Sequence, residues 1–367
     1  MRVAVVHDWL SESGGAEKVT RELVSLFDAD VFALVDFLSD EDRAFILNGK
    51  RTTTTFIQQM PFARDKVRWY LPLFPRAIER LDLGDYDLVI SSSYAVAKGV
   101  RTRPDQKHVC YIHTPMRWAW VHEEGYLRDH GMRSWKAWIL KRLLHRLRRW
   151  DRANSAHVDH FIANSRNVAE RVRRIYDRSA DVVLPPVDPE VFTLGTGKRD
   201  GFLVASRMVP YKRIDRIIEA FRELPGLSLT IVGDGPDAPR LRAMAGPNVR
   251  FAGQLPQSQL VERMQRSSAL ICAAHEDLGL TVIEAQACGT PVLALRAGGY
   301  LETVDVANGG RFFDTDDPAA IRDAVLRSVS DDIGVSPERL RDGMAAFSRE
   351  RFRERISAII QTVVGDA

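Results

Sequence analysis

Short apolar runs alternate with amphipathic helical patterns along almost the whole chain of 367 residues. Segments 16–26 and 167–175 repeat apolar residues at three- and four-residue steps, which is typical of helices. Five apolar runs in the first half have the length of strands: 2–7, 31–34, 88–91, 108–112 and 160–163. Strands that alternate with helices predict α/β architecture with parallel sheets.

A proline-rich segment, VVLPPVDPEVF at 182–192, interrupts this alternation. Pro185, Pro186 and Pro189 fit neither a central strand nor a helix interior, so the segment is interpreted as a linker. The strand pattern then resumes at 202–207, 227–235, 249–253, 268–274 and 291–295. We therefore expect two Rossmann-like domains facing a central cleft, at 1–184 and 185–346. A helix within 347–367 should pack back on the first domain.

Composition narrows the class of protein. Hydrophobic residues make up 45% and charged residues 28%, as in soluble globular proteins, and the length suits two domains. No apolar run approaches the ~18 residues of a membrane span, and the N-terminus lacks the features of a signal peptide. Three cysteines in apolar surroundings, without a CxxC pair, indicate reduced core residues in a cytoplasmic protein and no zinc site. A net charge of +3 does not imply nucleic-acid binding.

The stretch HEDLGLTVIEAQACGTP at 275–291 places Glu276 and Glu284 eight positions apart. On one continuous helix they would lie about 80° apart around the axis and roughly 12 Å along it. The alternative is that Glu276 ends a strand, a turn passes through Gly279, and a helix begins near Thr281. Ligands bind at the carboxyl ends of strands in such sheets, and helix N-termini favour anionic or hydroxyl-rich ligands. Taken alone, two acids at this spacing are more often solvated residues on a helix.

Three further motifs contain residue types suited to the diphosphate, ribose or base of a nucleotide. In ASRMVPYKR at 205–213, Arg207 offers a planar fork and Lys212 a mobile charge, which together suit a diphosphate. The glycines of GDGP (Gly233, Gly235) would allow close approach of the backbone to a base or ribose. Those of ESGGAEKV (Gly14, Gly15) could bring amides to a phosphate, although this is not a GxGxxG motif. Each motif could also be an ordinary turn.

In this order, the motifs resemble the family-4 retaining glycosyltransferases of the GT-B fold. The resemblance covers nearly the whole chain and is most specific in the Glu-x7-Glu segment with its upstream arginine and lysine. Leu278 departs from the family, because many members have phenylalanine there, and this weakens any inference about the sugar. Supporting segments are ESGGAEKV, YIHTPMRWAW (111–120), NSRNVAERVRRIY (164–176), PPVDPEVF, VGDGP, GTPV (289–292) and GGYLETV (298–304).

The resemblance implies a role for each matched residue on the donor side. Glu276 would contact hydroxyls of the donor sugar, and Glu284 would hold the ribose. Arg207 and Lys212 would neutralise the departing diphosphate, which is electrostatic stabilisation of developing charge. Such enzymes usually need no metal ion or other cofactor, and no convincing DxD motif is present. The backbone amide of Gly15 would bind the distal phosphate. Sugar hydroxyls would be bound by the backbone amides of Leu278, Gly279 and Leu280.

Three residues are assigned to the acceptor side or the reacting carbon. His113, in HTP after a strand, matches a family position near that carbon, although a lone histidine is often a core residue. Asp8 and Trp9, just beyond the first strand, could line the acceptor site. The predicted mechanism is front-face attack with retention, in which a phosphate oxygen takes the proton of the acceptor.

Residues 133–152 combine tryptophans and leucines with many lysines and arginines at helical spacing. Such a helix suits an anionic membrane surface, which would place the protein peripherally on the inner face of the cytoplasmic membrane. The alternative is a helix that packs its apolar stripe on the first domain and exposes a basic face. Without a recognised module, nucleic acid is a less favoured partner.

The first half of the chain resembles bacterial polysaccharide and O-antigen transferases, many of them mannosyltransferases, in the segments VHDWL, GGAEKV and YIHTPMRWAW. GDP-mannose is therefore favoured over UDP-sugars as donor, with a glycan or lipid-linked acceptor. Two alternatives stay open: a nucleotide-sugar epimerase or hydrolase of the same fold, and a non-catalytic scaffold or sensor. A dehydrogenase is disfavoured because the first strand is not followed by GxGxxG.

Overall fold

A computed structural model of the chain describes residues 1–11, 14–120, 135–304, 309–331 and 335–365. The chain divides into two compact units, which we describe separately. Unit 1 contains residues 1–186 together with the C-terminal segment from Arg349, and unit 2 contains residues 187–348. The boundary between Pro186 and Val187 lies within the proline-rich segment.

The described residues of unit 1 form a seven-stranded sheet in the order β3-β2-β1-β4-β5-β6-β7, and every pairing is parallel. All residues of the central strands β1 and β4 are buried, as expected when helices cover both faces of a sheet. The strands are β1 (Val3–His7), β2 (Asp30–Ala33), β3 (Thr52–Thr54), β4 (Leu88–Ser93), β5 (Lys107–Ile112), β6 (His160–Ala163) and β7 (Asp181–Val182).

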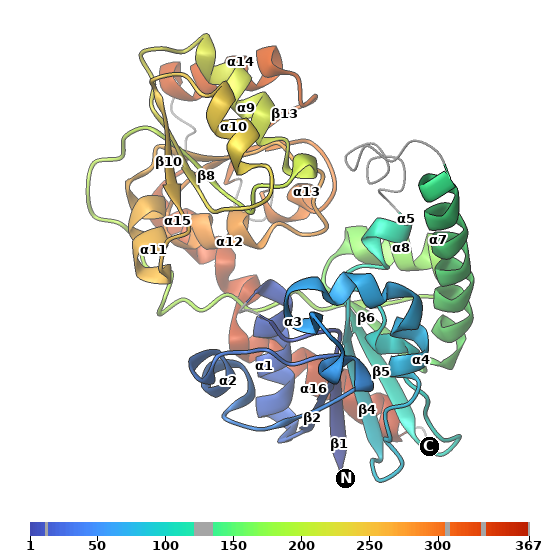
Figure 1. The fold of residues 1–367 in the computed structure, drawn as a ribbon. Coiled ribbons are helices and arrows are strands. Elements are labelled where there is room, and N and C mark those ends of the chain that lie inside the picture. Colours follow the sequence, from blue (N-terminus) through green and yellow to red (C-terminus); the bar gives the residue numbers. More distant parts are fainter. Residues whose placement is uncertain (12–13, 121–134, 305–308, 332–334, 366–367) are drawn as a thin grey trace. The chain divides into compact units, whose positions relative to one another are not determined.

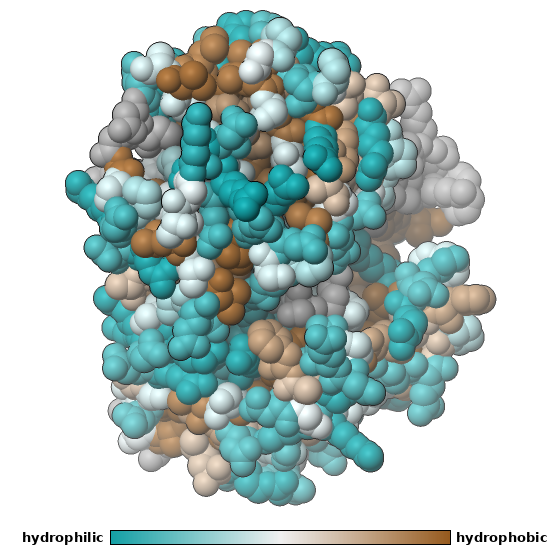
Figure 2. Space-filling view, turned by 90° about the vertical axis from the view of Figure 1, so that its left-hand side faces the viewer, coloured by the Kyte–Doolittle hydropathy of each residue, from teal (hydrophilic) through white to brown (hydrophobic). Residues whose placement is uncertain are grey.

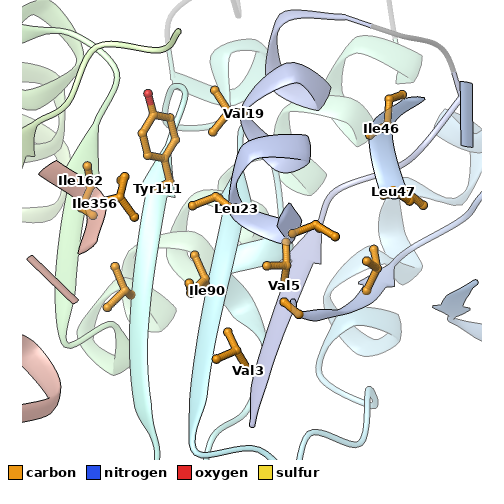
Figure 3. Close-up of a cluster of buried hydrophobic side chains, with 14 of the residues drawn as sticks. Val3, Val5, Val19, Leu23, Ile46, Leu47, Ile90, Tyr111, Ile162 and Ile356 are labelled. Atoms are coloured by element: carbon orange, nitrogen blue, oxygen red, sulfur yellow. The ribbon is translucent and has the colours of Figure 1, made fainter. Parts of the chain in front are cut away.

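Alternate residues of the strands in unit 1 enter different cores. Val3, Val5 and Ile90 pack with Leu23 of α1 and Ile356 of α16 on one face (Figure 3). Residues such as Ala4 and Val89 pack on the other face with α4 and α7. The helices are α1 (Gly15–Phe27), α2 (Asp40–Leu47), α3 (Ala63–Lys66), α4 (Phe74–Ile78), α5 (Arg117–Trp120), α7 (Trp135–Asn154), α8 (Arg166–Tyr176) and α16 (Arg349–Gly365), with 3-10 turns η1 (Phe56–Gln59), η2 (Val67–Leu73), η3 (Ala97–Gly99) and η4 (Ser155–His157).

The C-terminal helix α16 belongs to unit 1 (Figure 1). Its buried residues Phe352, Ile356 and Ile360 join the core beneath α1. Arg349 and Arg353 both pair with the buried Glu22 of α1, at 2.9 and 2.8 Å. Apolar burial and these charge-assisted hydrogen bonds attach the helix to the first unit.

Unit 2 has a second parallel sheet, six-stranded among the described residues, in the order β10-β9-β8-β11-β12-β13. A buried core that includes Ile217, Phe221, Ile231 and Ile271 packs against it. The strands are β8 (Phe202–Ala205), β9 (Leu229–Val232), β10 (Val249–Gly253), β11 (Ala269–Cys272), β12 (Val292–Leu295) and β13 (Gly310–Phe313). The helices are α9 (Ile214–Arg222), α10 (Ala238–Met244), α11 (Gln257–Arg266), α12 (Leu280–Ala287), α13 (Tyr300–Thr303), α14 (Pro318–Ser330) and α15 (Pro337–Gly343), with 3-10 turns η5 (Pro210–Lys212) and η7 (Met344–Phe347).

The predicted fold class, two Rossmann-like α/β layers, is confirmed. Strands β3, β7 and β13 were not anticipated from the sequence; β7 contains only two residues, Asp181 and Val182. In the described part of the chain, no helix has the length and apolarity that crossing a membrane requires. The surface drawn in Figure 2 is mostly hydrophilic, with apolar residues in separate patches.

Candidate active site

Each sheet contains one point at which the order of its strands reverses. In unit 2 the chain starts at β8, extends the sheet through β9 and β10, and returns to β11 on the other side of β8. In unit 1 the same reversal occurs between β1 and β4. The loops at the carboxyl ends of these strand pairs diverge, and open α/β sheets bind ligands in the resulting crevice. Arg207, Lys212 and Glu276 of unit 2 follow β8 or β11, and the candidates Asp8 to Gly15 of unit 1 follow β1.

Arg207 and Lys212 lie in the segment after β8, and Lys212 ends the 3-10 turn η5. The Lys212 ammonium donates a hydrogen bond to Oε1 of Glu276, which follows β11, so these two candidates are joined in an ion pair. Arg207 is exposed, and its guanidinium makes no hydrogen bond or ion pair with the residues that the structure describes. A free guanidinium therefore lies in the same segment as a paired ammonium.

The segment from Glu276 to Leu280 is a loop that leads into α12. The prediction that Glu276 ends a strand is wrong, because β11 ends at Cys272, and a continuous helix through both glutamates is excluded. Gly279 caps α12 in the left-handed region at φ 91°, and a β-carbon there would lie 2.7 Å from the Tyr300 ring. Glycine is required on both grounds. The Val282 amide donates to the Gly279 carbonyl oxygen at 2.9 Å, so the amides that the start of α12 can offer to a ligand are those of Leu280 and Thr281.

The pair Gly298–Gly299 supports this loop, and the sequence analysis gave it no role in the site. The amide of Gly299 donates to the carbonyl oxygen of Glu276 at 2.9 Å. A β-carbon on Gly298 would collide with that same carbonyl oxygen. The signal in the sequence was the double glycine separated from β12 by two residues, which begins the segment GGYLETV that supports the resemblance.

The remaining donor-side residues of unit 2 lie around the same edge. Gly233 and Gly235 form the turn after β9, which contacts the Arg207 segment through the Met208 amide and the Asp234 carbonyl oxygen, 2.8 Å apart. Glu284 lies within α12 and is only 9% exposed. The Leu278 side chain is buried, and Leu280 is half-buried. The ligand contacts of these residues stay predictions.

In unit 1, Asp8 follows β1 but does not line a surface, contrary to the expected acceptor-side role. Its side chain is fully buried. Oδ2 accepts the amides of Tyr94 and Ala95 at 2.6 and 2.9 Å, and Oδ1 those of Val96 and Ala97 at 2.5 and 2.7 Å. Burial raises the pKa of Asp8, and these amide donors oppose that rise. Asp8 therefore fixes the segment that follows β4.

Trp9 is half-buried and packs edge-on against Tyr94, with ring centroids 4.9 Å apart. Gly14 and Gly15 begin α1, and residues 12 and 13 of the motif lie outside the described residues. Glu17 of the first turn lies beneath the loop: its Oε2 is 2.7 Å from the position of a β-carbon on Gly14. A side chain at Gly14 would displace this carboxylate.

His113 follows β5, and its amide donates to the carbonyl oxygen of Ser93 at 2.8 Å. The ring lies against Tyr111 and Tyr94, with centroids 5.2 and 6.2 Å away, and its Nε2 is 2.9 Å from Oγ of Ser92. Burial, reinforced by the nearby His7, lowers the pKa of His113 to about 3. The imidazole is therefore neutral near pH 7 and can donate or accept a hydrogen bond.

The structure thus brings Lys212 together with Glu276, and places the Gly233–Gly235 turn beside the Arg207 segment, all in unit 2. Trp9, Gly14, Gly15 and His113 belong to unit 1. Among residues 1–11, 14–120, 135–304, 309–331 and 335–365, no three histidine, cysteine, aspartate or glutamate side chains converge as metal ligands. The predicted basic helix corresponds to α7, whose expected residues 133 and 134 lie outside the described residues.

Two protein families match the chain in succession. Residues 13–191 match the family described as Glycosyltransferase Family 4, and residues 189–350 match Glycosyl transferases group 1. A D-inositol 3-phosphate glycosyltransferase of Acidothermus cellulolyticus is 31% identical over 56% of this chain and 53% of its own length. A GDP-mannose-dependent phosphatidylinositol monomannoside mannosyltransferase of Mycolicibacterium smegmatis is 36% identical over 37% of this chain and 40% of its own. The chain thus spans about half, or less, of these relatives.

Solved structures agree on the fold. Sucrose-phosphate synthase of Thermosynechococcus elongatus superposes with a TM-score of 0.76 at 17% identity, over 100% of both chains. HepE of Anabaena, in complex with UDP-glucose, gives 0.70 at 15% identity, over 99% of this chain and 100% of that one. Two parallel Rossmann-like units with these loops define a GT-B protein. The chain belongs to the family-4 glycosyltransferases, with a group-1 domain as its second unit.

Proposed function

We propose that the protein is a retaining glycosyltransferase that moves mannose from GDP-mannose to a glycan or lipid-linked acceptor. The observation that carries this proposal is the Lys212–Glu276 ion pair at the strand-order reversal of unit 2. Arg207 lies in the same loop segment as Lys212, and its guanidinium has no partner within the described part of the chain. An ammonium that already contacts a carboxylate can also contact a phosphate, because it has three donors. Glu276 would then bind the sugar, and Lys212 the diphosphate, of the same donor molecule.

The proposed chemistry follows from the charges of these side chains. When the bond between the anomeric carbon and the phosphate oxygen breaks, negative charge grows on the diphosphate. Arg207 and Lys212 stabilise that charge, and the amides at the start of α12 and of α1 add further donors. Glu276 accepts hydrogen bonds from sugar hydroxyls and thereby orients the sugar. These cations do the work that a metal ion does in other transferases.

The proposed stereochemistry is retention by front-face attack. The acceptor hydroxyl bonds to the anomeric carbon on the face from which the diphosphate leaves, and its proton passes to a phosphate oxygen. No protein nucleophile is required. Neutral His113 of unit 1 serves as a hydrogen-bonding partner of the sugar rather than as a base.

The donor assignment rests on names of relatives. Mannosyltransferases of Mycolicibacterium smegmatis and Corynebacterium glutamicum, 36% and 35% identical over 37% and 28% of this chain, are described as GDP-mannose-dependent. HepE was solved with UDP-glucose, but at 15% identity it supports the fold and not the donor. GDP-mannose is therefore favoured over a UDP-sugar.

A transfer assay with GDP-mannose and UDP-glucose, each with a lipid-linked glycan acceptor, tests this function. We expect GDP release matched by an α-mannosylated product, which shows retention because the donor is an α-anomer. GDP release without a glycosylated acceptor would identify a hydrolase, and an epimerised donor an epimerase. Nucleotide binding without any turnover would identify a scaffold or sensor. Each of these outcomes contradicts the proposal.

We extend the proposal to an anionic membrane surface that presents the acceptor, contacted through α7. Leu144 and Leu147 bury the inner side of this helix in unit 1. Trp138 and Ile139 are 59% and 49% exposed, and the Arg142 guanidinium stacks on the Trp138 ring at 4.6 Å. Exposed tryptophan beside cations suits a lipid headgroup region. Co-sedimentation with vesicles containing anionic lipid should occur at low salt and weaken as salt rises; no binding at low salt would contradict this role.

A further inference from the structure

A continuous chain of buried polar groups connects the first turn of α1 with His113. Glu17 Oε1 lies 3.2 Å from Nε2 of His7, and Nδ1 of His7 lies 3.1 Å from Oγ of Ser92. Oγ of Ser92 is in turn 2.9 Å from Nε2 of His113. The Thr20 hydroxyl lies beside this chain, 3.0 Å from both His7 Nδ1 and Ser92 Oγ. His7, Thr20 and Ser92 are fully buried.

Hydrogen-bond accounting restricts where the protons of this chain lie. A carboxylate only accepts, so His7 carries its proton on Nε2 and donates to Glu17. Nδ1 of His7 then needs a donor, and only the hydroxyls of Thr20 and Ser92 are within reach. If the Thr20 hydroxyl donates to Nδ1 of His7, the Ser92 hydroxyl can donate to Nε2 of His113. If Ser92 donates to His7, Nε2 of His113 must carry a proton and donate to Ser92.

The first arrangement lets each hydroxyl donate to a different ring. Thr20 lies 3.0 Å from Nδ1 of His7, and Ser92 lies 2.9 Å from Nε2 of His113. The Ala16 carbonyl oxygen, 3.2 Å from the Thr20 hydroxyl, is the more distant acceptor and lies one helical turn back in α1. In this arrangement both ring nitrogens that face the chain receive a hydroxyl proton. No buried member of the chain is left unsatisfied.

We propose that Thr20 and Ser92 are positioning residues that hold His113 in the tautomer with its proton on Nδ1. Nδ1 makes no hydrogen bond with the described residues, so its N–H is available to an oxygen of the donor sugar or of a phosphate. This inference rests on the proposed function, because the Nδ1 proton is useful only if a donor sugar or phosphate binds beside His113. Thr20, His7 and Glu17 act through His113 and need not touch the substrate.

The same chain passes beneath the glycine loop. Glu17, which fixes the tautomer of His7, lies directly under Gly14. The loop proposed to bind phosphate and the histidine proposed to bind sugar therefore share one hydrogen-bonded support within unit 1. A substitution at Gly14 that displaces Glu17 should therefore alter the hydrogen bonding of His113 as well.

Two substitutions at Thr20 separate this role from packing. Thr20→Val keeps the shape but removes the hydroxyl, so Ser92 must donate to His7 instead of His113. His113 then carries its proton on Nε2, and its Nδ1 can no longer donate a hydrogen bond. Thr20→Ser loses a methyl group but keeps the hydroxyl. We expect kcat for transfer to fall about tenfold in Thr20→Val, the effect of one hydrogen bond, and to stay within about threefold in Thr20→Ser. If the two variants lose kcat equally, or if Thr20→Ser loses more, the residue acts only through packing.

The tautomer can also be read directly by nitrogen-15 NMR of histidine-labelled protein, with His113→Gln to assign the signals. We expect Nδ1 of His113 to be protonated in the wild type and Nε2 to be protonated in Thr20→Val. A proton on Nε2 in the wild type would overturn the proposal. This measurement needs no substrate, so it distinguishes failure of the positioning chain from failure of the proposed transferase function. The wild-type spectrum, once assigned, is decisive even if Thr20→Val does not fold.

Discussion

Replacing Glu276 by glutamine should lower kcat for sugar transfer by about 10³-fold while leaving the fold intact. The substitution keeps the shape of the side chain but removes the charge that pairs with Lys212. The sugar hydroxyls then lose a charged acceptor, and Lys212 loses the partner that holds it in place. Steady-state kinetics at saturating donor, with circular dichroism of both proteins, measures the effect.

A matched control is Glu262→Gln, at an exposed position of α11 in the same unit, where the glutamate pairs with Arg266 one helical turn away. Surface pairs of this kind contribute little, so its kcat should equal that of the wild type. Full activity of Glu276→Gln would remove this carboxylate from the mechanism. Equal losses in the two variants would show that the effect is not specific to the site.

Replacing Asp8 by alanine should lower the free energy of unfolding by roughly 4 kcal/mol, because four amides lose their acceptor at once. These amides belong to residues 94–97, which lie between β4 and β5 and have no strand partner to replace the carboxylate. Denaturant unfolding of the wild type and the variant gives the difference. The segment that contains Tyr94, and with it one side of the His113 ring, should become less ordered.

Asp85→Ala is the control for this stability effect. Its carboxylate is 83% exposed and pairs with Arg2 at 3.6 Å, so its loss should change the unfolding free energy by about 0.5 kcal/mol or less. A loss of similar size in both variants would contradict the structural role of Asp8. So would an Asp8→Ala protein that keeps full stability but loses affinity for an acceptor.

The site residues that could be predicted from the sequence are those that come shortly after a predicted strand. Arg207, Lys212 and Glu276 come after two strands that are far apart in sequence, and the reversal of strand order makes those strands neighbours. The alternation of strands and helices predicted a common edge for these residues, because parallel sheets place all carboxyl ends together. The resemblance to family-4 glycosyltransferases joined them into one expected site, and the neighbouring positions of the two strands come from the structure. The two-unit division followed from three prolines that fit neither helix nor sheet.

The errors and omissions have a different physical origin. Asp8 was expected to line the acceptor site because it lies just beyond the first strand. Its burial depends on residues 94–97 donating amides to it from more than 80 positions away in sequence. The buried chain through His7 was missed for a related reason: His7 lies opposite Ser92 only in the observed register of β1 and β4. Such pairings are properties of the folded sheet and are not visible in local patterns.

Calorimetric titration with GDP-mannose, UDP-glucose, GDP and GMP tests most directly whether the second unit recognises a nucleoside diphosphate through Arg207 and Lys212. The account predicts that GDP-mannose and GDP bind, that GMP binds at least about tenfold more weakly, and that Lys212→Ala removes most of this difference. Equal affinity for GDP and GMP in the wild type, or no binding of any nucleotide, would contradict it.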